Sequence, residues 1–325
     1  MLGLTDWLFL ILSTAEFILG LLMNGLIGLV NGSGWFKNKR ISLCDFIITS
    51  LAISRILLLW VLLVDGVLLV FYPKEHESGV LMKMIDLFWT CTNHLSIWLT
   101  TCLGVLYCLK IACFSHPIFL WLKRRVSRVV AWLLLGALLL SCGSTLSLLH
   151  EFKVNSGFSG INVTGKEMER MSRKRGEYKL IHVLGTLWYL LPLVVSLVSY
   201  LLLILSLGRH TRRMRYTGAG CRDPSTEAHH RAIRIILSFF FLLLLYFLAF
   251  SVASTSYFFP ETTMVLMAAE IIAMLYLVGH SFILILGNPK LRQTFVGLLQ
   301  CESGCLKPGS KFVSPHRAAE DQKGP

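Results

Sequence analysis

Aromatic, amide and carboxylate side chains occur inside apolar stretches of this chain, where polar groups are costly. Trp89 and Asn93 are four residues apart and therefore share one face of a helix, with His94 beside them. Glu270 is a carboxylate in a later apolar stretch. An aromatic ring, an amide and a carboxylate that converge from different helices suit a largely apolar small-molecule pocket. Interface anchors and interhelical hydrogen bonds use the same residue types, so composition leaves both interpretations open.

A second ionisable side chain, Arg55, lies near the middle of the apolar run LAISRILLLW. A charge at bilayer depth costs about 2.5–3.5 kcal/mol on insertion scales, so Arg55 must face other helices and find partners there. Asn24 in the first apolar stretch is a candidate partner, as are polar groups of the last stretch. We favour a buried packing hub that joins three helices and has no ligand role of its own.

No enzyme signature accompanies these groups. The sequence contains no HExxH, no Gly-rich phosphate loop and no Gly-x-Ser-x-Gly nucleophile. His229 and His230 are adjacent, and adjacent residues do not face a common metal on a helix. We therefore expect no catalytic residue, no metal and no cofactor.

Seven apolar stretches, each near twenty residues or longer, must position these side chains. A bilayer core about 30 Å thick needs about 20 residues of helix to cross it, and lipid cannot hydrogen-bond a bare backbone. The sequence thus predicts an all-α membrane protein, a seven-transmembrane helix bundle of the kind that more often signals than transports. The stretches run roughly Trp7–Val30, Leu43–Tyr72, Leu81–Ile111, Val129–His150, Leu180–Leu207, Ile233–Phe259 and Met264–Gly287.

Composition agrees with a membrane protein. Of the 325 residues, 55% are apolar and 15% are charged, against about 25% charged residues in soluble domains. The net charge of +13 sits in the connections between apolar stretches and forms no basic stripe interleaved with aromatics, so we expect no nucleic-acid partner. Cytoplasmic loops lying against anionic membrane lipid account for such a charge.

The distribution of Lys and Arg predicts orientation. The segment before the first stretch has neither, whereas the first loop carries Lys37, Lys39 and Arg40. We therefore expect the N-terminus outside and the C-terminus in the cytoplasm. The segment from Lys153 to Lys179 argues against this orientation, because it is basic and this orientation places it outside. It also holds a glycosylation acceptor at Asn162, which the lumenal transferase could reach.

We expect one receptor domain over residues 1–300, closed by a short amphipathic helix at about 289–300, and a disordered cytoplasmic tail over 301–325. Cys301 and Cys305 follow that helix, where S-palmitoylation and two unmodified thiols are equally open. The segment from His150 to Lys179 has no cysteine, so a disulfide from the third stretch to it is excluded.

Four sequence motifs carry a resemblance to a known family. The run LYCLKIACFSHPIFLWLKRR at Leu106–Arg125 stands where rhodopsin-like receptors carry Asp-Arg-Tyr, and HSFILILGNPKLRQTF at His280–Phe295 replaces their Asn-Pro-x-x-Tyr. The sixth stretch has Tyr246 and lacks their Trp-x-Pro. With LAISR at Leu51–Arg55 and RDPSTEAHHRA at Arg222–Ala232, the chain closely resembles the type 2, or bitter, taste receptors, from Leu2 to about Gly309.

The resemblance implies a G-protein-coupled receptor of the plasma membrane. It would bind small, mostly apolar bitter agonists in the outer half of the bundle and activate a heterotrimeric G protein of the gustducin type, with phospholipase C and calcium signalling downstream. A polytopic transporter or channel is the alternative, with Arg55 and Glu270 on its substrate path.

The resemblance also implies roles for residues that match the family's motifs. Trp89 would give a ring contact and Asn93 a directional hydrogen bond, Glu270 could pair with a basic agonist, and Tyr246 would couple the pocket floor to the sixth helix. The implied ligand-binding residues are Trp89, Asn93, His94, Tyr246 and Glu270; the polar hub is Asn24, Arg55, His280 and Ser281; the G-protein-facing residues are Tyr107, Lys110, His210, Lys290 and Arg292.

Overall fold

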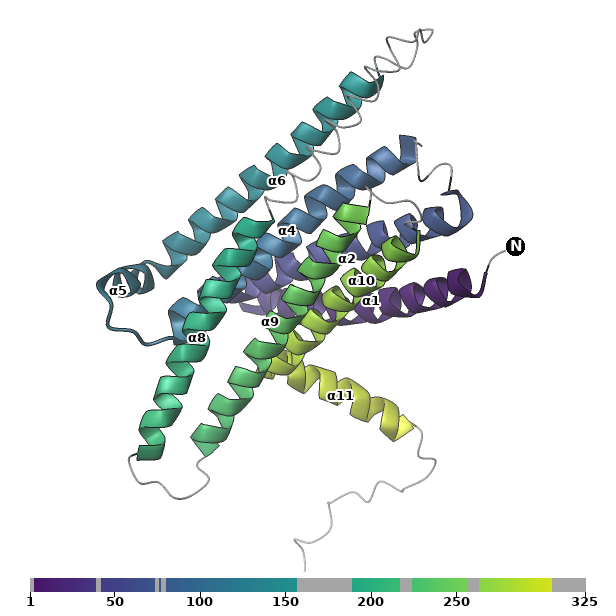
Figure 1. Cartoon of the computed structure of the whole chain (residues 1–325). Coiled ribbons are helices and arrows are strands. Elements are labelled where there is room, and N and C mark those ends of the chain that lie inside the picture. Colours follow the sequence, from purple (N-terminus) through teal and green to yellow (C-terminus); the bar gives the residue numbers. More distant parts are fainter. Residues whose placement is uncertain are drawn as a thin grey trace, which may run out of the picture.

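The computed structural model describes residues 3–38, 42–73, 76, 80–156, 189–216, 224–256 and 263–305. In these ranges the regular secondary structure is helical (Figure 1). The helices are α1 (Leu4–Asn38), α2 (Leu43–Phe71), α4 (Val80–Ile111), α5 (Pro117–Arg124), α6 (Val126–Ser156), α8 (Leu190–Tyr216), α9 (Pro224–Ser256), α10 (Thr263–Gly287) and α11 (Pro289–Cys305).

Seven of the described helices are long and apolar enough to cross a membrane, which confirms the predicted fold class. The apolar segments are Leu4–Trp35, Leu43–Phe71, Leu81–Ile111, Val126–Gly143, Leu190–Arg209, Ile233–Ala253 and Thr263–Gly287. Helix α1 continues past the expected end at Val30 because hydropathy marks where lipid contact ends, and backbone hydrogen bonding can carry a helix further. The expected start of the fifth stretch at Leu180 lies outside the described residues.

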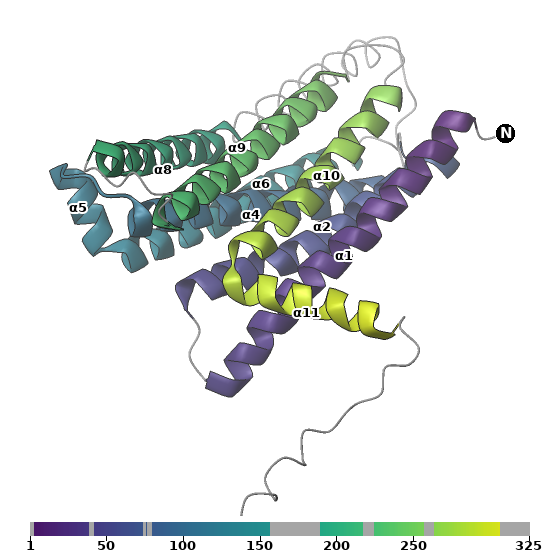
Figure 2. The same ribbon diagram turned by 90° about the horizontal axis from the view of Figure 1, so that it is seen from below.

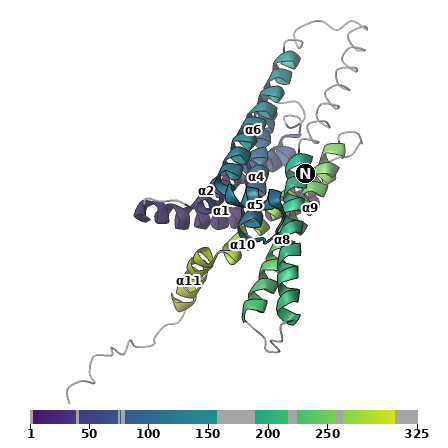
Figure 3. The same cartoon turned by 90° about the vertical axis from the view of Figure 1, so that its left-hand side faces the viewer.

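Helix α4 is the centre of the bundle. It is the most buried of the seven spans and packs against α2, α6 and α8. Helix α1 packs on α2 and α10, and α9 lies between α8 and α10 (Figure 2). The helices α8 and α9 run side by side, as Figure 3 also shows. Side chains of α4 can therefore contact side chains of α2, α6 and α8.

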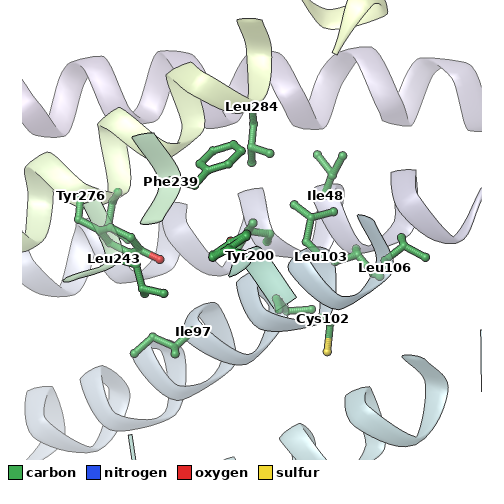
Figure 4. Packing of buried hydrophobic residues seen from close by; sticks show 14 of the residues in the cluster. Ile48, Ile97, Cys102, Leu103, Leu106, Tyr200, Phe239, Leu243, Tyr276 and Leu284 are labelled. Atoms are coloured by element: carbon green, nitrogen blue, oxygen red, sulfur yellow. The ribbon is translucent and has the colours of Figure 1, made fainter. Parts of the chain in front are cut away.

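The apolar core joins most of the spans. Figure 4 shows Tyr200 of α8, Tyr276 of α10 and Leu103 of α4 within it, together with Phe239 and Leu243 of α9. Large apolar side chains also cover the outward faces of the helices, for example those of Trp60, Phe241 and Leu248. A soluble protein rarely exposes so much contiguous apolar surface, whereas lipid is a suitable neighbour for it. Since lipid is as apolar as leucine, close packing and interhelical hydrogen bonds must hold the bundle together.

Helix α11 lies across the ends of α1 and α10 (Figure 2). Its start is set by Asn288, whose side-chain oxygen accepts a 3.0 Å hydrogen bond from the Lys290 backbone N–H, and by Pro289, which suits the first helical position. The helix continues to Cys305, five residues past the expected end, so the expected boundary of the tail at residue 301 falls within it. Residues 306–325 lie outside the described part of the chain.

Candidate functional site

A hydrogen bond between α9 and α4 organises the first group of candidate residues. The Tyr246 hydroxyl donates to the Asn93 amide oxygen at 2.6 Å, and both side chains are buried. The Asn93 amide nitrogen, Nδ2, makes no hydrogen bond of standard geometry among the described residues, although the Tyr189 hydroxyl lies close enough to interact with Asn93. The amide therefore retains a donor in an otherwise apolar setting.

Aromatic rings surround this hydrogen bond. Trp89 of α4 stacks on Phe250 of α9 with ring centroids 5.6 Å apart, and Tyr246 lies parallel to the same ring at 6.5 Å. Tyr189, just before α8, lies 4.8 Å from Phe250 and 4.2 Å from the His94 ring. These contacts bring together three elements. We call Trp89, Asn93, His94, Tyr189, Tyr246 and Phe250 the aromatic cluster.

Helical spacing places these residues. Trp89 and Asn93 are one pair four residues apart on α4, and Tyr246 and Phe250 are another on α9. Residues four apart lie one above the other on a helix face, so the two pairs can meet along the contact between the helices. Phe250 was not among the predicted site residues, although its spacing from Tyr246 places it on the same face of α9. Tyr189 was not among them either, since the expected fifth stretch placed it in the middle of a span without any distinguishing signal.

Glu270 lies at a different contact. A Cβ added to Gly66 of α2 would lie 2.7 Å from Glu270 Oε1 and 2.9 Å from the Phe9 ring of α1, so these two side chains crowd over the glycine. Phe9 also packs with Leu69 and Met267 in a small apolar cluster. The described hydrogen bonds and ring contacts join Glu270 to no residue of the aromatic cluster. The structure therefore places this carboxyl among α1, α2 and α10.

Three of the four expected hub residues, Asn24, Arg55 and Ser281, form a buried hydrogen-bond chain, whereas the His280 ring nitrogens take no part in it. Arg55 Nη1 donates to Ser281 Oγ at 2.9 Å, and Ser281 Oγ donates to Asn24 Oδ1 at 2.8 Å. The Asn24 amide donates to the Gly20 carbonyl at 2.8 Å, and Arg55 Nη2 donates to Thr100 Oγ1 at 3.3 Å. The chain connects α2, α10, α1 and α4. It is one helix more than the three expected, because Thr100 of α4 also takes part.

Tyr276 of α10 connects the hub to the aromatic cluster. Its ring stacks on Tyr246 at 4.7 Å and lies 5.7 Å from the guanidinium carbon of Arg55. His280 is 5.8 Å from Tyr276 on one side and 4.4 Å from Phe239 of α9 on the other. Tyr276 was not among the predicted site residues. A continuous path of contacts therefore runs from Asn93 through Tyr246 and Tyr276 to Arg55.

The expected G-protein-facing residues lie near the C-terminal ends of α4 and α8 and in the first turn of α11. Tyr107 is half-buried and accepts a 3.8 Å contact from the Cys44 thiol, while Lys110 is exposed. Arg292 is half-buried and Lys290 is exposed, and a Cβ added to Gly34 of α1 would meet Lys290 Nζ at 2.8 Å. His210 belongs to α8, but its side chain lies outside the described part.

The expected modification sites fall largely outside the described part of the chain. Asn162 lies outside the described residues, and Cys301 and Cys305 belong to α11 while their side chains lie outside the description. Among the described residues, no group of three or more His, Cys, Asp or Glu side chains is arranged to hold a metal ion.

A family model and individual relatives both match this chain over nearly its whole length. A family model described as "Taste receptor protein (TAS2R)" matches residues 1–303. The protein named Taste receptor type 2 member 3 from Papio hamadryas is 67% identical over 309 residues, which cover 95% of this chain and 98% of that protein. Its namesakes are 66% identical in Homo sapiens, over 96% of this chain and 98% of theirs, and 56% identical in Mus musculus, over 97% and 99%.

Proposed function

Since the chain belongs to the TAS2R family of taste receptors and is therefore a bitter taste G-protein-coupled receptor of the plasma membrane, we propose that agonists bind at the aromatic cluster. The observation that carries this proposal is the 2.6 Å hydrogen bond between Tyr246 and Asn93, surrounded by ring faces of Trp89 and Phe250. A small apolar agonist can stack on these rings, and an acceptor atom on it can take the unpaired amide N–H of Asn93.

Binding at this cluster would act on Tyr246. An agonist that accepts from Asn93 Nδ2 would reposition the amide whose oxygen holds the Tyr246 hydroxyl, and would thereby shift the ring that stacks on Tyr276. Because Tyr276 lies against the Arg55 guanidinium, the shift reaches the hub that joins α1, α2, α4 and α10. To move the equilibrium from 1:99 to 99:1, an agonist must prefer the active bundle by about 5.5 kcal/mol. Weaker preferences give partial responses.

The signalling side follows from orientation. We place the N-terminus outside and the C-terminal ends of α4, α8 and α10 in the cytoplasm, because the connection after α1 is basic and the N-terminal segment is not. A gustducin-type G protein would then contact the residues at these ends and in α11, which are Tyr107, Lys110, His210, Lys290 and Arg292. Phospholipase C and calcium release follow downstream.

A calcium assay in transfected cells tests the coupling. The receptor is expressed with a G-protein α chimera that couples to calcium and ends in the gustducin C-terminus, and bitter compounds are screened. We expect compound-dependent calcium release that is lost when the chimera ends in an unrelated C-terminus. Equal release with the two chimeras would refute gustducin-type coupling.

The same cells test the agonist site. Asn93→Ala and Trp89→Ala receptors are compared with Ser13→Ala, which removes a buried α1 hydroxyl whose described hydrogen bonds are to the carbonyls of Phe9 and Leu10 in its own helix. We expect the α4 variants to lower potency at normal surface density and the α1 variant to leave potency unchanged. Unaltered potency in both α4 variants would place the agonist site elsewhere.

A further inference from the structure

The positive charge of Arg55 is buried without a negative partner. The side chain has 0% of its surface exposed, and its two bonded nitrogens, Nη1 and Nη2, donate to the hydroxyl groups of Ser281 and Thr100. Its third nitrogen, Nε, has no partner among the described residues. The described chain also shows no ion pair between Arg55 and a carboxylate. A buried charge left uncompensated is strongly destabilising, so some compensation is needed.

The nearest carboxyl groups on its own helix are distant. Asp45 and Asp65 are each ten residues from Arg55, which is roughly 15 Å along a helix. Glu270 is eleven residues from the Arg55 partner Ser281, and Glu16 is eight residues from Asn24, which is roughly 12–17 Å. None of these groups is in hydrogen-bond reach of the guanidinium. Protein carboxylates in the described part therefore do not balance this charge.

Other buried polar atoms without hydrogen-bond partners belong to Tyr276, which contacts the guanidinium, and to residues next to Tyr276 or Thr100. The Tyr276 ring lies 5.7 Å from the Arg55 guanidinium carbon, and its hydroxyl is close enough to interact with the guanidinium, but its O–H has no acceptor among the described residues. His280, 5.8 Å from Tyr276, has two unpaired ring nitrogens, and Ser96 has an unpaired hydroxyl. Ser96 is one turn from Thr100, the residue that accepts from Arg55 Nη2, and its carbonyl accepts from the Thr100 hydroxyl. All of these side chains are buried.

These unpaired atoms share one chemical property, since each of the four side chains can donate a hydrogen bond. Buried polar groups nearly always have a partner, so their concentration here calls for a common acceptor. The positive charge requires that acceptor to be negative, and a single guanidinium balances a single negative charge. The apolar surroundings, which include Phe239 and Leu277, disfavour a large or multiply charged anion.

We propose that Arg55, Ser96, Tyr276 and His280 bind a chloride ion in the middle of the bundle. The ion accepts hydrogen bonds from Arg55 Nε, from the Ser96 and Tyr276 hydroxyl groups and from the His280 ring. It compensates the guanidinium charge and ties α2, α4 and α10 together. Its position beside Tyr276 places it next to the path of contacts between the aromatic cluster and the hub.

Thermal unfolding of the purified receptor in nanodiscs tests the site. The unfolding midpoint is measured in sodium chloride and in sodium gluconate, each at about 150 mM so that charge screening is equal. A ligand that binds only the folded state raises the midpoint, so chloride should raise it by at least about 3 °C and the effect should saturate. Bromide should replace chloride. Equal unfolding midpoints in chloride and gluconate would show that chloride does not bind these donors and would overturn the proposal.

Variants locate the effect. Tyr276→Phe keeps the ring and its stacking but removes one donor, and Ser96→Ala removes another, so each should reduce the chloride-dependent shift by about half or more. Arg55→Met, which removes the charge, should abolish the shift. Ser13→Ala is the control, because its buried hydroxyl already bonds to its own helix, and it should keep the full shift. If Arg55→Met does not fold, the other two variants decide. A full shift in both would refute the site.

Discussion

Tyr246 of α9 donates a 2.6 Å hydrogen bond to the amide oxygen of Asn93 on α4, and this contact is buried from both sides. The same tyrosine ring stacks on Tyr276 of α10. One side chain of α9 therefore contacts both α4 and α10 and lies between the proposed agonist site and the hub. A change at Asn93, whether a ligand or a mutation causes it, must therefore alter the position of the Tyr246 side chain.

The first prediction concerns this pair. Asn93→Ala should raise the agonist concentration for half-maximal calcium response by about tenfold, since a buried hydrogen bond contributes about 0.5–1.5 kcal/mol and 1.4 kcal/mol is tenfold in affinity. Tyr246→Phe should act in the same direction. Because both variants remove the same hydrogen bond, the potency of the double variant should be no lower than that of the more impaired single variant. Surface labelling is the control, and a matching loss of surface receptor would show that Asn93 is structural.

The second prediction concerns Phe250, which contacts Trp89, Tyr189 and Tyr246. Phe250→Ala should lower potency by tenfold or more for apolar agonists, because stacked aromatic contacts contribute about 0.5–1.5 kcal/mol beyond the apolar area that they bury. Phe250→Tyr keeps the ring and should retain most of the potency. Dose–response curves in the calcium assay measure both. Equal potency of the Ala and Tyr variants would show that the ring has no role in binding.

The third prediction concerns Arg55. Arg55→Ala removes the donor to Ser281 and Thr100 and should lower expression or signalling for every agonist. Among the described residues, the hub contacts the aromatic cluster through Tyr276, so no single class of agonist should be affected alone. Maximal responses to a panel of unrelated agonists, normalised to surface density, measure this. A loss confined to one agonist would place Arg55 at the ligand instead.

The fourth prediction concerns Glu270, which lies against Gly66 and Phe9 and apart from the aromatic cluster. If this carboxyl pairs with basic agonists, Glu270→Gln should reduce their potency by tenfold or more and leave neutral agonists unchanged, because the amide keeps the shape and loses the charge. Parallel dose–response curves for one basic and one neutral agonist measure the difference. Equal losses for both would mean that Glu270 only packs α10 against α1 and α2.

The helices were predictable from the sequence because lipid permits so few alternatives for an apolar stretch of twenty residues. The burial of Arg55 was predictable for the same reason, since a charge in a span must turn toward other helices. Ring contacts such as those of Tyr189 and Tyr276 were not, because they depend on how each helix is rotated and tilted. Glu270 shows the same difficulty: its sequence position indicates its depth, and only packing shows that it faces Gly66.

The fifth prediction follows from the close approach at Gly66. A Cβ at this position of α2 would meet Phe9 Cζ at 2.9 Å and Glu270 Oε1 at 2.7 Å, so Gly66→Ala must push both side chains aside. Overpacking costs about 1–3 kcal/mol, which should lower the unfolding midpoint by about 2–6 °C and reduce surface density. Gly136→Ala is the matched control, because a Cβ there has no atom within 4 Å and alanine favours a helix over glycine. Phe9→Leu should recover part of the loss in the Gly66→Ala background, since a smaller side chain relieves the ring contact. Equal midpoints for Gly66→Ala and Gly136→Ala would show that α1 and α10 adjust without cost and that this contact does not fix Glu270 in place.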